Sequence, residues 1–575
     1  MMLKTMSMLR QVPAKAWRAA RDPRKIRAWW DVRRDYRAYR QAYGFLAGTM
    51  GREEPGKCLL IVSLSNWIAQ IKVESMLAGA LRLRGWSPAV LTWSGCRDAQ
   101  RYFPVAGITD LIALDEELRA AAPEQAEAEQ RAEALLAGAF TLNALLDVRY
   151  REVWVGRHVL STLVRSSLQG RIDLSDASTK ARLRQGLAEA VRVVDATHRL
   201  FDRLAPRSVL FLEKGYSPFG ELYDVAVNRG LNVIHWHHAH CADALVLKRY
   251  TERNRHLHAF SLSDASWEAA RHTPWTARHE QALDDEITGR YRSGSWFNRK
   301  FHHHNKRVKP PEEVRAQLGL RPGRKTAVIF SHVLWDATFF FGANLFDDYE
   351  HWLIETVKAA CRNDAVNWVV KIHPDYVWKL KMLGGGTVRD HLALQANIGA
   401  LPPHVTLLHP DTDLSTGSLF GVMDYCLTVR GTIGIEASCF GIPVLTAGTG
   451  RYSGLGFTVD SRSREEYLER LRRIHEMPRM SPAQTELARR HAYALLRLRP
   501  CPFTSFEVVQ TSLERMGHPL DHDVVIRIGS LSELLDAADL RRFAEWVDGS
   551  RDEDFLMPES PVAESGDLVA VGSGP

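Results

Sequence analysis

The sequence predicts an α/β protein built from two doubly wound, parallel-sheet domains that face each other across a cleft. Short apolar runs with β-branched residues alternate with segments whose apolar positions recur at helical spacing. This alternation occurs twice along the chain, before and after a polar, basic segment at 293–311. Strands that alternate with helices form parallel sheets covered on both faces, so each series predicts one domain.

The first series is predicted to form a domain over 51–300 with a helical insert. It begins with the run CLLIVSLSNW at 58–67, and a helical pattern that ends at Gly85 leads to a second strand, SPAVLTW. The remaining expected elements are a strand ITDLIAL, a mostly helical stretch from about 124 to 204 that breaks near 169–178, strands at 208–216 and 231–236, and a helix at 219–228.

The second series is predicted to form a domain over 312–480, and helices over 481–548 are expected to pack across the domain junction. In sheets of this kind ligands bind beyond the carboxyl ends of the strands, so the cleft between the two domains is the expected site. The expected strands are 325–330, 367–372, 405–408, 424–429 and 443–447, and the expected helices are 346–362, 432–440, 463–476 and 482–499.

The N-terminal arm, residues 1–50, is predicted to be a basic amphipathic helix. Residues 1–43 carry a net charge of +9, more than the +7 of the whole chain, so the remaining residues sum to −2. The arginines alternate with aromatic residues, which is typical of a helix on an anionic membrane surface or an acidic partner. The alternative is an arginine-rich helix packed on the body. Nucleic-acid binding is not expected, because no recognisable binding motif accompanies the arm. The aromatic residues are Trp17, Trp29, Trp30, Tyr36, Tyr39 and Tyr43.

The composition is that of a cytosolic enzyme, with 45% hydrophobic and 25% charged residues. No run of about 18 apolar residues and no apolar centre of a secretory signal is present, so a cytoplasmic protein is expected. Seven scattered cysteines without C-x-x-C spacing favour reduced thiols over disulfides or a zinc finger. The acidic segment 549–575, rich in Gly, Ser and Pro, is predicted to be a disordered tail.

The stretch VVKIHPD at 369–375 is the first candidate for ligand chemistry. An apolar strand leads directly into Lys371 and His373, and Pro374 ends strand pairing there. A histidine at the carboxyl end of a strand can donate a hydrogen bond to a phosphate, and the lysine can add positive charge. Ser331 and His332 follow the first strand of the same domain and are predicted at the same edge.

The stretch DYCLTVRGTIGIEASCF at 424–440 is the second candidate. Gly431 lets a ligand approach the backbone closely, and Thr432 begins a helix whose free amides favour an anion. Glu436, about one turn later, is a candidate to accept hydrogen bonds from ribose hydroxyls. Because both stretches end elements of one sheet, a shared nucleotide site is predicted, with Arg430 as part of it or as a surface residue.

The histidine cluster HWHHAH at 235–240 leaves two interpretations open. Histidines on alternate positions of a strand can ligate zinc, yet no second cluster at metal spacing accompanies them. The other interpretation is a cleft lining in which one or two imidazoles, His237 and His238 among them, meet acceptor hydroxyls or phosphate. We expect no metal site here.

The span 325–460, with KIHPD, LLHPDTDL and VRGTIGIEASCFGIPVLTAGTGRYSGLGFT, resembles the nucleotide-binding half of bacterial capsule and surface polysaccharide glycosyltransferases. It is similar in particular to the Capsule polysaccharide biosynthesis family, which includes Kdo transferases and has the GT-B fold of two Rossmann-like domains. The stretch 212–240 resembles the segment that faces the acceptor in such enzymes. The resemblance covers about half of the chain, and not the arm, the insert or the region after 500.

This resemblance implies a role for each candidate residue. His373 would contact the donor phosphate, with Gly431 and Thr432 assisting, and Glu436 would hold the ribose or base. The other donor-binding candidates are Ser331, His332, Lys371 and Arg430. Glu213 would be the general base, with His238 as a second catalytic candidate, and the acceptor-binding candidates are Lys214, Gly215, Tyr216 and His237. The sequence Glu213-Lys214-Gly215 departs from the Asp-Gly or Glu-Gly of relatives, so the register of the base and the anomeric outcome stay open.

The expected function is therefore transfer of a sugar from a nucleotide donor, with a CMP-sugar as one candidate, to a capsule, lipopolysaccharide or similar surface glycan. The acceptor is expected to be lipid-linked, with the enzyme peripheral on the inner face of the cytoplasmic membrane. No cofactor and no obligate metal are expected. The alternatives are a nucleotide-sugar 2-epimerase or a polyol-phosphate transferase on the same architecture, and a non-catalytic export or assembly component.

Overall fold

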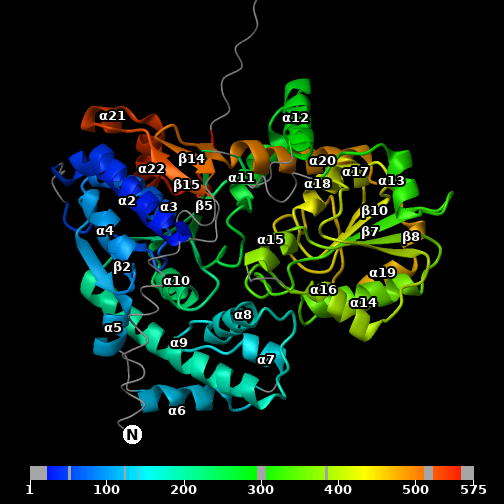
Figure 1. Cartoon of the computed structure of the whole chain (residues 1–575), viewed down its shortest axis with the longest axis horizontal. Helices are drawn as coiled ribbons and strands as arrows, with labels where there is room; N and C mark the ends of the chain where they lie inside the picture. The colour runs from blue at the N-terminus through cyan, green and yellow to red at the C-terminus, as the bar shows by residue number, and fades with distance from the viewer. Residues whose placement is uncertain are drawn as a thin grey trace, which may run out of the picture.

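The computed structural model contains two α/β domains, each built on one twisted sheet (Figure 1). None of the helices described has both the length and the apolar character needed to span a bilayer. The predicted fold class, two Rossmann-like doubly wound domains, is confirmed. The structure describes residues 23–48, 54–121, 125–139, 141–241, 243–293, 306–382, 386–510 and 522–557.

The first domain has a sheet in the order β13-β6-β5-β4-β1-β2-β3. The strands from β3 to β5 are parallel, and β6 and β13 extend the sheet antiparallel. The apolar runs therefore predicted the parallel strands, whereas β6 and β13 were not predicted. The strands are β1 (Cys58–Val62), β2 (Ser87–Thr92), β3 (Asp110–Ala113), β4 (Ser208–Phe211), β5 (Asn232–His238), β6 (Ala244–Tyr250) and β13 (Cys501–Pro502).

Helices cover both faces of this sheet, and α8 and α9 of the predicted helical insert pack with α10 on one of these faces (Figure 1). The covering helices are α3 (Ile68–Arg82), α4 (Arg97–Val105), α5 (Leu114–Ala121) and α10 (Phe219–Asn228). The insert contains α6 (Gln125–Leu136), α7 (Leu142–Leu146), α8 (Val155–Ser167) and α9 (Ala177–Leu204).

The second domain has an all-parallel sheet in the order β12-β11-β10-β7-β8-β9. The order reverses between β7 and β10, which makes the carboxyl ends of these two strands the topological switch point. The strands are β7 (Thr326–Phe330), β8 (Asn367–Lys371), β9 (Val405–Leu408), β10 (Tyr425–Thr428), β11 (Val444–Thr446) and β12 (Val459–Asp460). The helices are α13 (Pro311–Leu318), α14 (Tyr349–Cys361), α15 (Asp375–Met382), α16 (Arg389–Asn397), α17 (Thr416–Leu419), α18 (Ile433–Cys439) and α19 (Arg464–Arg472).

Helices also connect the two domains. The chain leaves the first domain through α11 (Asp264–His272) and α12 (Ala277–Ser293), and residues 294–305 of the predicted linker lie outside the described residues. It returns through α20 (Pro482–Tyr493) and the π-helix η4 (Ala494–Leu498). Because α20 packs on α18 as well as on α11 and α12, it bridges the junction as predicted for this segment.

The prediction of junction helices over 481–548 is wrong beyond η4, because the chain after residue 500 rejoins the first domain. Strand β13 pairs with β6, and helix α22 packs on α3 beside the N-terminal helix (Figure 1). The alternating pattern of a short edge hairpin is weak, which is why these strands were not predicted. The elements are the hairpin β14 (Phe506–Gln510) and β15 (His522–Ile526), and the helices α21 (Leu531–Asp536) and α22 (Ala538–Gly549).

The described part of the N-terminal arm packs on the first domain. Helix α2 (Pro23–Tyr43) buries Tyr39 and Tyr43 in the core around α3 and α4, and Trp30 is 55% exposed. Lys72 of α3 forms an ion pair with Asp35 at 2.6 Å. These tyrosines therefore belong to the core and are not free to insert into a membrane, while Trp17 lies outside the described residues.

The predicted disordered tail starts too early, because residues 549–557 pack on the first domain. The carboxylate of Asp554 lies fully buried between Lys248, at 2.7 Å, and Arg499, at 3.3 Å. It also accepts a hydrogen bond from the backbone N–H of Ser263. Composition suggested disorder, but one buried acidic residue with two buried cations fixes the segment. Residues 558–575 lie outside the described residues.

We expect Asp554→Asn to destabilise the protein by about 3 to 5 kcal/mol, because it leaves two buried cations without their counter-charge. Burial alone would raise the pKa of Asp554, but Arg499 and Lys248 lower it to about 2. This stabilisation is therefore present above the pKa of an unfolded aspartate, about 3.9, and is lost as the pH falls toward 2.

Urea unfolding at pH 7 checks this prediction. Asp552→Asn is the matched control, since the side chain of Asp552 is exposed, and we expect it to change the free energy of unfolding by less than about 0.5 kcal/mol. Equal effects of the two substitutions would contradict the role assigned to Asp554.

Candidate functional site

A two-part cleft lies between the domains, at the carboxyl ends of the strands of the second sheet. The larger compartment has a volume of about 790 Å³, and the smaller has about 450 Å³. Both volumes lie within the range of small-molecule sites. The two compartments share His258 of the first domain and His332, Asp336, His373, Asp375, Gly431, Thr432 and Arg451 of the second.

His373 and Ser331 meet at the ends of neighbouring strands, as their positions in the sequence predicted. The backbone N–H of His373 donates to Ser331 Oγ at 3.0 Å. The backbone N–H of Asp375 donates to His373 Nδ1 at 3.2 Å, so the ring proton resides on Nε2. His373 therefore offers a hydrogen-bond donor to the cleft.

His332 orients the turn after β10. Its ring stacks on Tyr349 with 4.4 Å between centroids, and its Nε2 accepts a hydrogen bond from the backbone N–H of Val429 at 3.2 Å. Burial holds the pKa of His332 well below its usual value, and the charges of His373 and Arg430 lower it further. A neutral imidazole at the switch point thus lines both compartments.

Arg430 is buried rather than on the surface, and it holds a loop. Its guanidinium donates to the carbonyl oxygens of Phe341 and Ala343 and to the side chain of Asn344. These hydrogen bonds hold the loop 333–344, and the donor-binding role of Arg430 stays a prediction. The side chain still lines the larger compartment.

Gly431 and Thr432 begin α18 at the wall of the cleft. The N–H of Gly431 donates to Thr428 Oγ1 at 3.2 Å, and a Cβ on this glycine would lie 2.9 Å from the same oxygen. The tight turn therefore requires glycine, and it brings Thr432 to the surface of both compartments.

Glu436 lines the smaller compartment and is held by a residue that the sequence did not indicate. Its carboxylate accepts a hydrogen bond from the hydroxyl of Tyr291 at the end of α12. Burial raises the pKa of Glu436. The connecting helix between the domains thus contributes directly to the wall predicted to meet a ribose.

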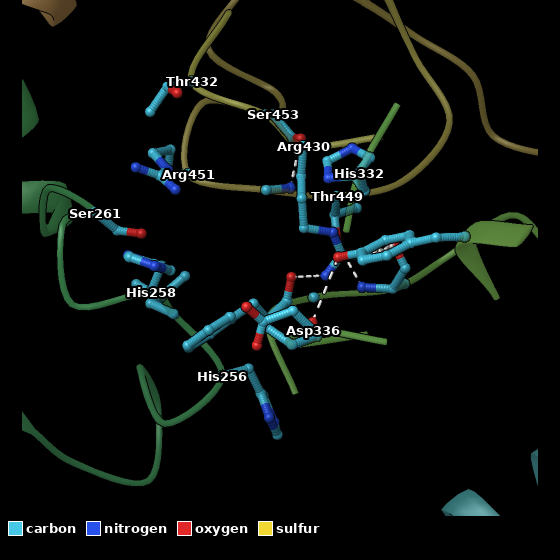
Figure 2. A pocket seen from close by; sticks show the side chains of 18 of the residues that line it. His256, His258, Ser261, His332, Asp336, Arg430, Thr432, Thr449, Arg451 and Ser453 are labelled. Carbon is cyan, nitrogen blue, oxygen red and sulfur yellow. Dashed lines mark hydrogen bonds between the residues drawn. The ribbon is translucent and has the colours of Figure 1, made fainter. Parts of the chain in front are cut away.

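Arg451 is the main functional candidate that sequence reasoning missed. It follows β11 in a glycine-rich loop and lies between Thr432 and the first-domain residues Ser261 and His258 (Figure 2). Among the described residues its guanidinium has no hydrogen-bond or ion-pair partner, although it lines both compartments. Burial lowers its pKa. The signal available was a basic residue in the glycine-rich loop that follows a buried strand.

Lys371 lines the smaller compartment, and its donor-binding role stays a prediction. Its residue surface is only 3% exposed, and burial lowers its pKa to about 7. The predicted donor residues of the second domain therefore lie around the two-part cleft. Arg430 differs from the others because its guanidinium hydrogen-bonds to the loop 333–344.

The segment 213–216 serves the domain contact rather than the cleft. Glu213 lines neither compartment, because its Oε1 accepts hydrogen bonds from the backbone N–H groups of Lys214, at 2.7 Å, and Gly215, at 3.1 Å. Buried Lys214 donates to two backbone carbonyl oxygens, those of Arg255 and Leu257. The geometry does not support the predicted roles of base and acceptor contact for these residues.

Tyr216 and Gly215 contact the second domain directly. The hydroxyl of Tyr216 donates to Asp336 Oδ1 at 2.9 Å, and its ring packs edge-on against Phe340. A Cβ on Gly215 would lie 2.3 Å from the Phe340 ring. The predicted exposed, acceptor-facing tyrosine is therefore a buried contact between domains, and Phe340 packs in this contact.

The histidines of β5 separate by face. His237 lines the smaller compartment, whereas His238 points to the other face of the sheet and packs between Trp67 and Trp236, outside both compartments. The position of His238 outside the cleft therefore does not support the predicted catalytic role. In the described part of the chain, no group of three His, Cys, Asp or Glu side chains is placed to hold a metal ion.

Two carboxylates line both compartments and differ in their surroundings. Asp336 pairs with Lys379 at 2.6 Å and lies 3.7 Å from Arg165. Burial would raise the pKa of Asp336, but these two cations lower it below its usual range. Asp375 follows Pro374 as the first residue of α15. Asp336 and Asp375 thus place two carboxylates in the wall of the cleft, which Glu213 does not line.

The first-domain wall of the larger compartment is basic and aromatic. Arg157 stacks over Trp154 with 3.5 Å between the guanidinium carbon and the ring centroid. Burial lowers the pKa of Arg157 to about 10, so it stays charged at neutral pH. Burial holds the pKa of His258 well below its usual value. Cations from both domains face the cavity, an arrangement that favours an anionic ligand.

We expect Gly215→Ala to disturb the domain contact, because the added methyl group overlaps the Phe340 ring. Overpacking of this kind costs about 1 to 3 kcal/mol. Gly289→Ala, on the exposed face of α12 with no atom within 4 Å of the new Cβ, is the control. Thermal unfolding and small-angle scattering check the pair, and unchanged stability and radius of gyration in Gly215→Ala would contradict the contact.

Comparison with known proteins gives likenesses in structure only. No protein-family model and no curated protein sequence matches the chain. The chain is similar to KpsC, a β-Kdo 2,4 transferase of Thermosulfurimonas dismutans, at 14% identity and a TM-score of 0.31, covering 51% of this chain and 81% of that one.

Two further solved structures are similar over a larger share of the chain. The UDP-GlcNAc 2-epimerase of Neisseria meningitidis, bound to UDP-GlcNAc, matches at 12% identity and a TM-score of 0.26, covering 76% of this chain and 97% of that one. The spinosyn rhamnosyltransferase SpnG matches at 12% identity and a TM-score of 0.25, covering 76% and 98%. At such identities and TM-scores the fold assignment rests on the chain's own two sheets.

Proposed function

We propose that this protein is a glycosyltransferase that moves a sugar from a nucleotide donor to a glycan acceptor in the interdomain cleft. The observation that carries the proposal is the half-buried guanidinium of Arg451, which lines both compartments and has no hydrogen-bond or ion-pair partner among the described residues. Partial burial of a cation without a partner is costly unless a ligand supplies the counter-charge. The phosphates of a nucleotide sugar supply it.

The donor is placed with its nucleoside in the smaller compartment. Glu436, held by Tyr291, accepts hydrogen bonds from ribose hydroxyls there. The phosphates lie near Arg451 and the Nε2–H donor of His373, so that the sugar extends into the larger compartment. This arrangement uses the carboxyl ends of neighbouring parallel strands, where doubly wound domains bind nucleotides.

Transfer takes place in the larger compartment, where both domains contribute. The acceptor hydroxyl attacks the anomeric carbon, and the bond from that carbon to the donor phosphate breaks with its electron pair on the phosphate oxygen. A carboxylate must accept the hydroxyl proton. We assign that role to Asp375, which lines the cavity, and place Glu213 second because its carboxylate caps its own loop.

We further propose that the enzyme works at the cytoplasmic face of an anionic membrane on a lipid-linked surface glycan. The support is helix α2, whose tyrosines pack on the body while the opposite side exposes basic residues. Deleting the arm would expose the core around Tyr39 and Tyr43, so charge removal is the sharper test. The exposed arginines are Arg33, Arg34, Arg37 and Arg40.

Serine at all four positions is expected to weaken binding to phosphatidylglycerol vesicles by at least about 100-fold, since each cation near an anionic surface contributes about 1 kcal/mol. Co-sedimentation with these vesicles and with phosphatidylcholine vesicles measures this. Undiminished binding of the variant to the anionic vesicles would contradict the membrane proposal and leave the transferase proposal intact.

The donor site is tested by thermal shift against CMP, CDP, UDP and GDP. We expect at least one of them to raise Tm, because a ligand that binds only the folded state stabilises it by mass action. Arg451→Met is expected to weaken that binding about 10- to 100-fold, the range for losing a hydrogen bond to a charged group. The control is Arg462→Met, at an exposed position of the same domain. No response to any of the four nucleotides would refute the donor site.

The catalytic assignment is tested by paired carboxylate variants. Asp375→Asn is expected to lower kcat at least about 100-fold while nucleotide binding persists, because general-base catalysis contributes about that much or more. Glu213→Gln is expected to keep most activity. Product analysis by mass spectrometry follows sugar transfer to the acceptor, and epimerised free donor in place of an extended glycan would favour the epimerase alternative. An inactive Glu213→Gln variant beside a fully active Asp375→Asn variant would reverse the assignment.

A further inference from the structure

Lys371 differs from the other buried lysines of the described chain. Lys72, Lys248 and Lys214 each have partners, which are carboxylates for the first two and two backbone carbonyl oxygens for the third. Lys371 is just as buried, at 3% exposed, yet among the described residues it has no hydrogen-bond partner and no carboxylate within the 4.0 Å of an ion pair. Its position is therefore not explained by the packing of the protein alone.

Lys371 lines a cavity at the carboxyl edge of the second sheet. Lys371 is the last residue of β8, paired with Phe330 of β7 and Leu408 of β9, so it stands at the carboxyl edge of the sheet. It lines the smaller compartment together with Ser331, His373 and the hydroxyl residues Ser415 and Thr416. A buried amine at the wall of a cavity that holds polar donors is placed to meet a ligand.

The charged groups around Lys371 do not neutralise an ammonium there. Burial, together with the positive charge of Lys306 on the segment before α13, lowers the pKa of Lys371 to about 7. On α16, burial raises the pKa of Asp390 to about 7, so this carboxyl is only partly ionised. His373 and Asp375 follow Lys371 on its own loop, and Glu436 faces the compartment from α18 with a pKa that burial raises.

We infer that Lys371 takes up a proton when the phosphate group of the donor enters the smaller compartment, and that it then serves as the charge partner of that group. The inference deepens the proposed function and rests on it. In the empty cleft the amine is largely neutral slightly above pH 7. An anion at its side favours the ammonium form through Coulombic attraction and a charge-assisted hydrogen bond.

The sign of the pH dependence follows from linkage. Phosphate binding raises the affinity of Lys371 for its proton, so this contribution to binding is complete below the pKa of the empty site. It is lost as the pH rises through the higher value of the occupied site. During transfer the leaving nucleotide gains one negative charge, when the electron pair of the broken bond stays on the phosphate oxygen. The ammonium of Lys371 is then already in place to balance it.

Isothermal titration calorimetry with UDP and with CMP at pH 7.5, in HEPES and in Tris, measures the protons exchanged. We expect an uptake of up to about three quarters of a proton per nucleotide bound, because a group with a pKa of about 7 is about one quarter protonated at that pH. Uridine and cytidine, which lack phosphate, are expected to bind without uptake.

Lys371→Arg carries a permanent charge and is expected to bind the nucleotide while losing the uptake. Lys371→Met is expected to bind at least about 10-fold more weakly with a flattened pH dependence. Lys358→Arg, at a partly exposed lysine of α14, is the matched control and keeps the uptake. Nucleotide binding without uptake in the natural protein, or uptake that persists in Lys371→Arg, overturns the inference while the proposed donor site stands.

The empty protein provides a test that needs no nucleotide. Reductive ¹³C-dimethylation gives each lysine an NMR signal, and the signal of Lys371 is the one lost in Lys371→Arg. We expect its titration midpoint near pH 7, about three units below an exposed lysine. A midpoint at the ordinary value overturns the inference, whereas failure of UDP and CMP to bind despite a low midpoint refutes the proposed function instead.

Discussion

The contact between the loop 333–344 of the second domain and the segment 213–216 of the first sets the shape of the functional cleft. The Tyr216 hydroxyl donates to Asp336, and the Phe340 ring occupies the space that a side chain on Gly215 would fill. Asp336 is fixed in turn by Lys379, and Arg430 holds the far end of the same loop. Because a cavity between domains has the width that their contact allows, these few residues determine the distance between the two walls.

The buried cations of the protein fall into two groups, those paired with a carboxylate of the protein and those that line the cleft without such a partner. The ion pairs of Lys248 and Arg499 with Asp554 satisfy buried charges within the protein, whereas Arg451 and Lys371 remain without a partner among the described residues. Burial without compensation is unfavourable for folding. The structure tolerates it at the carboxyl edge of one sheet, where an anionic ligand can supply the missing charge. The same edge supplies the Nε2–H donor of His373 and the carboxylate of Glu436.

The chain connects its domains twice, and one of these connections reaches the site. Helix α12 ends with Tyr291 on Glu436, and its Glu286 pairs with His240 of the first domain. Helix α20 returns beside it through a π-helix, a feature found frequently at functional sites. Any movement of the domains therefore alters the surroundings of Glu436, so the domain arrangement and the smaller compartment are linked through Tyr291.

The sequence by itself determined the two alternating series and their strands, because apolar periodicity is a local property. It also placed His373, Gly431 and Thr432 at one edge, because the carboxyl ends of parallel strands lie at the same edge of a sheet. It also predicted that Lys371 and Glu436 line that edge. The tertiary structure alone decided the direction of the loop side chains. Glu213 turned to cap its own amides, His238 fell on the far face of β5, and Arg451 and Tyr291 came into the site. Asp554 likewise became ordered only through a lysine and an arginine distant in sequence. The placements of Tyr291 on Glu436 and of Asp554 on Lys248 depend on contacts between segments more than a hundred residues apart, which no local pattern encodes.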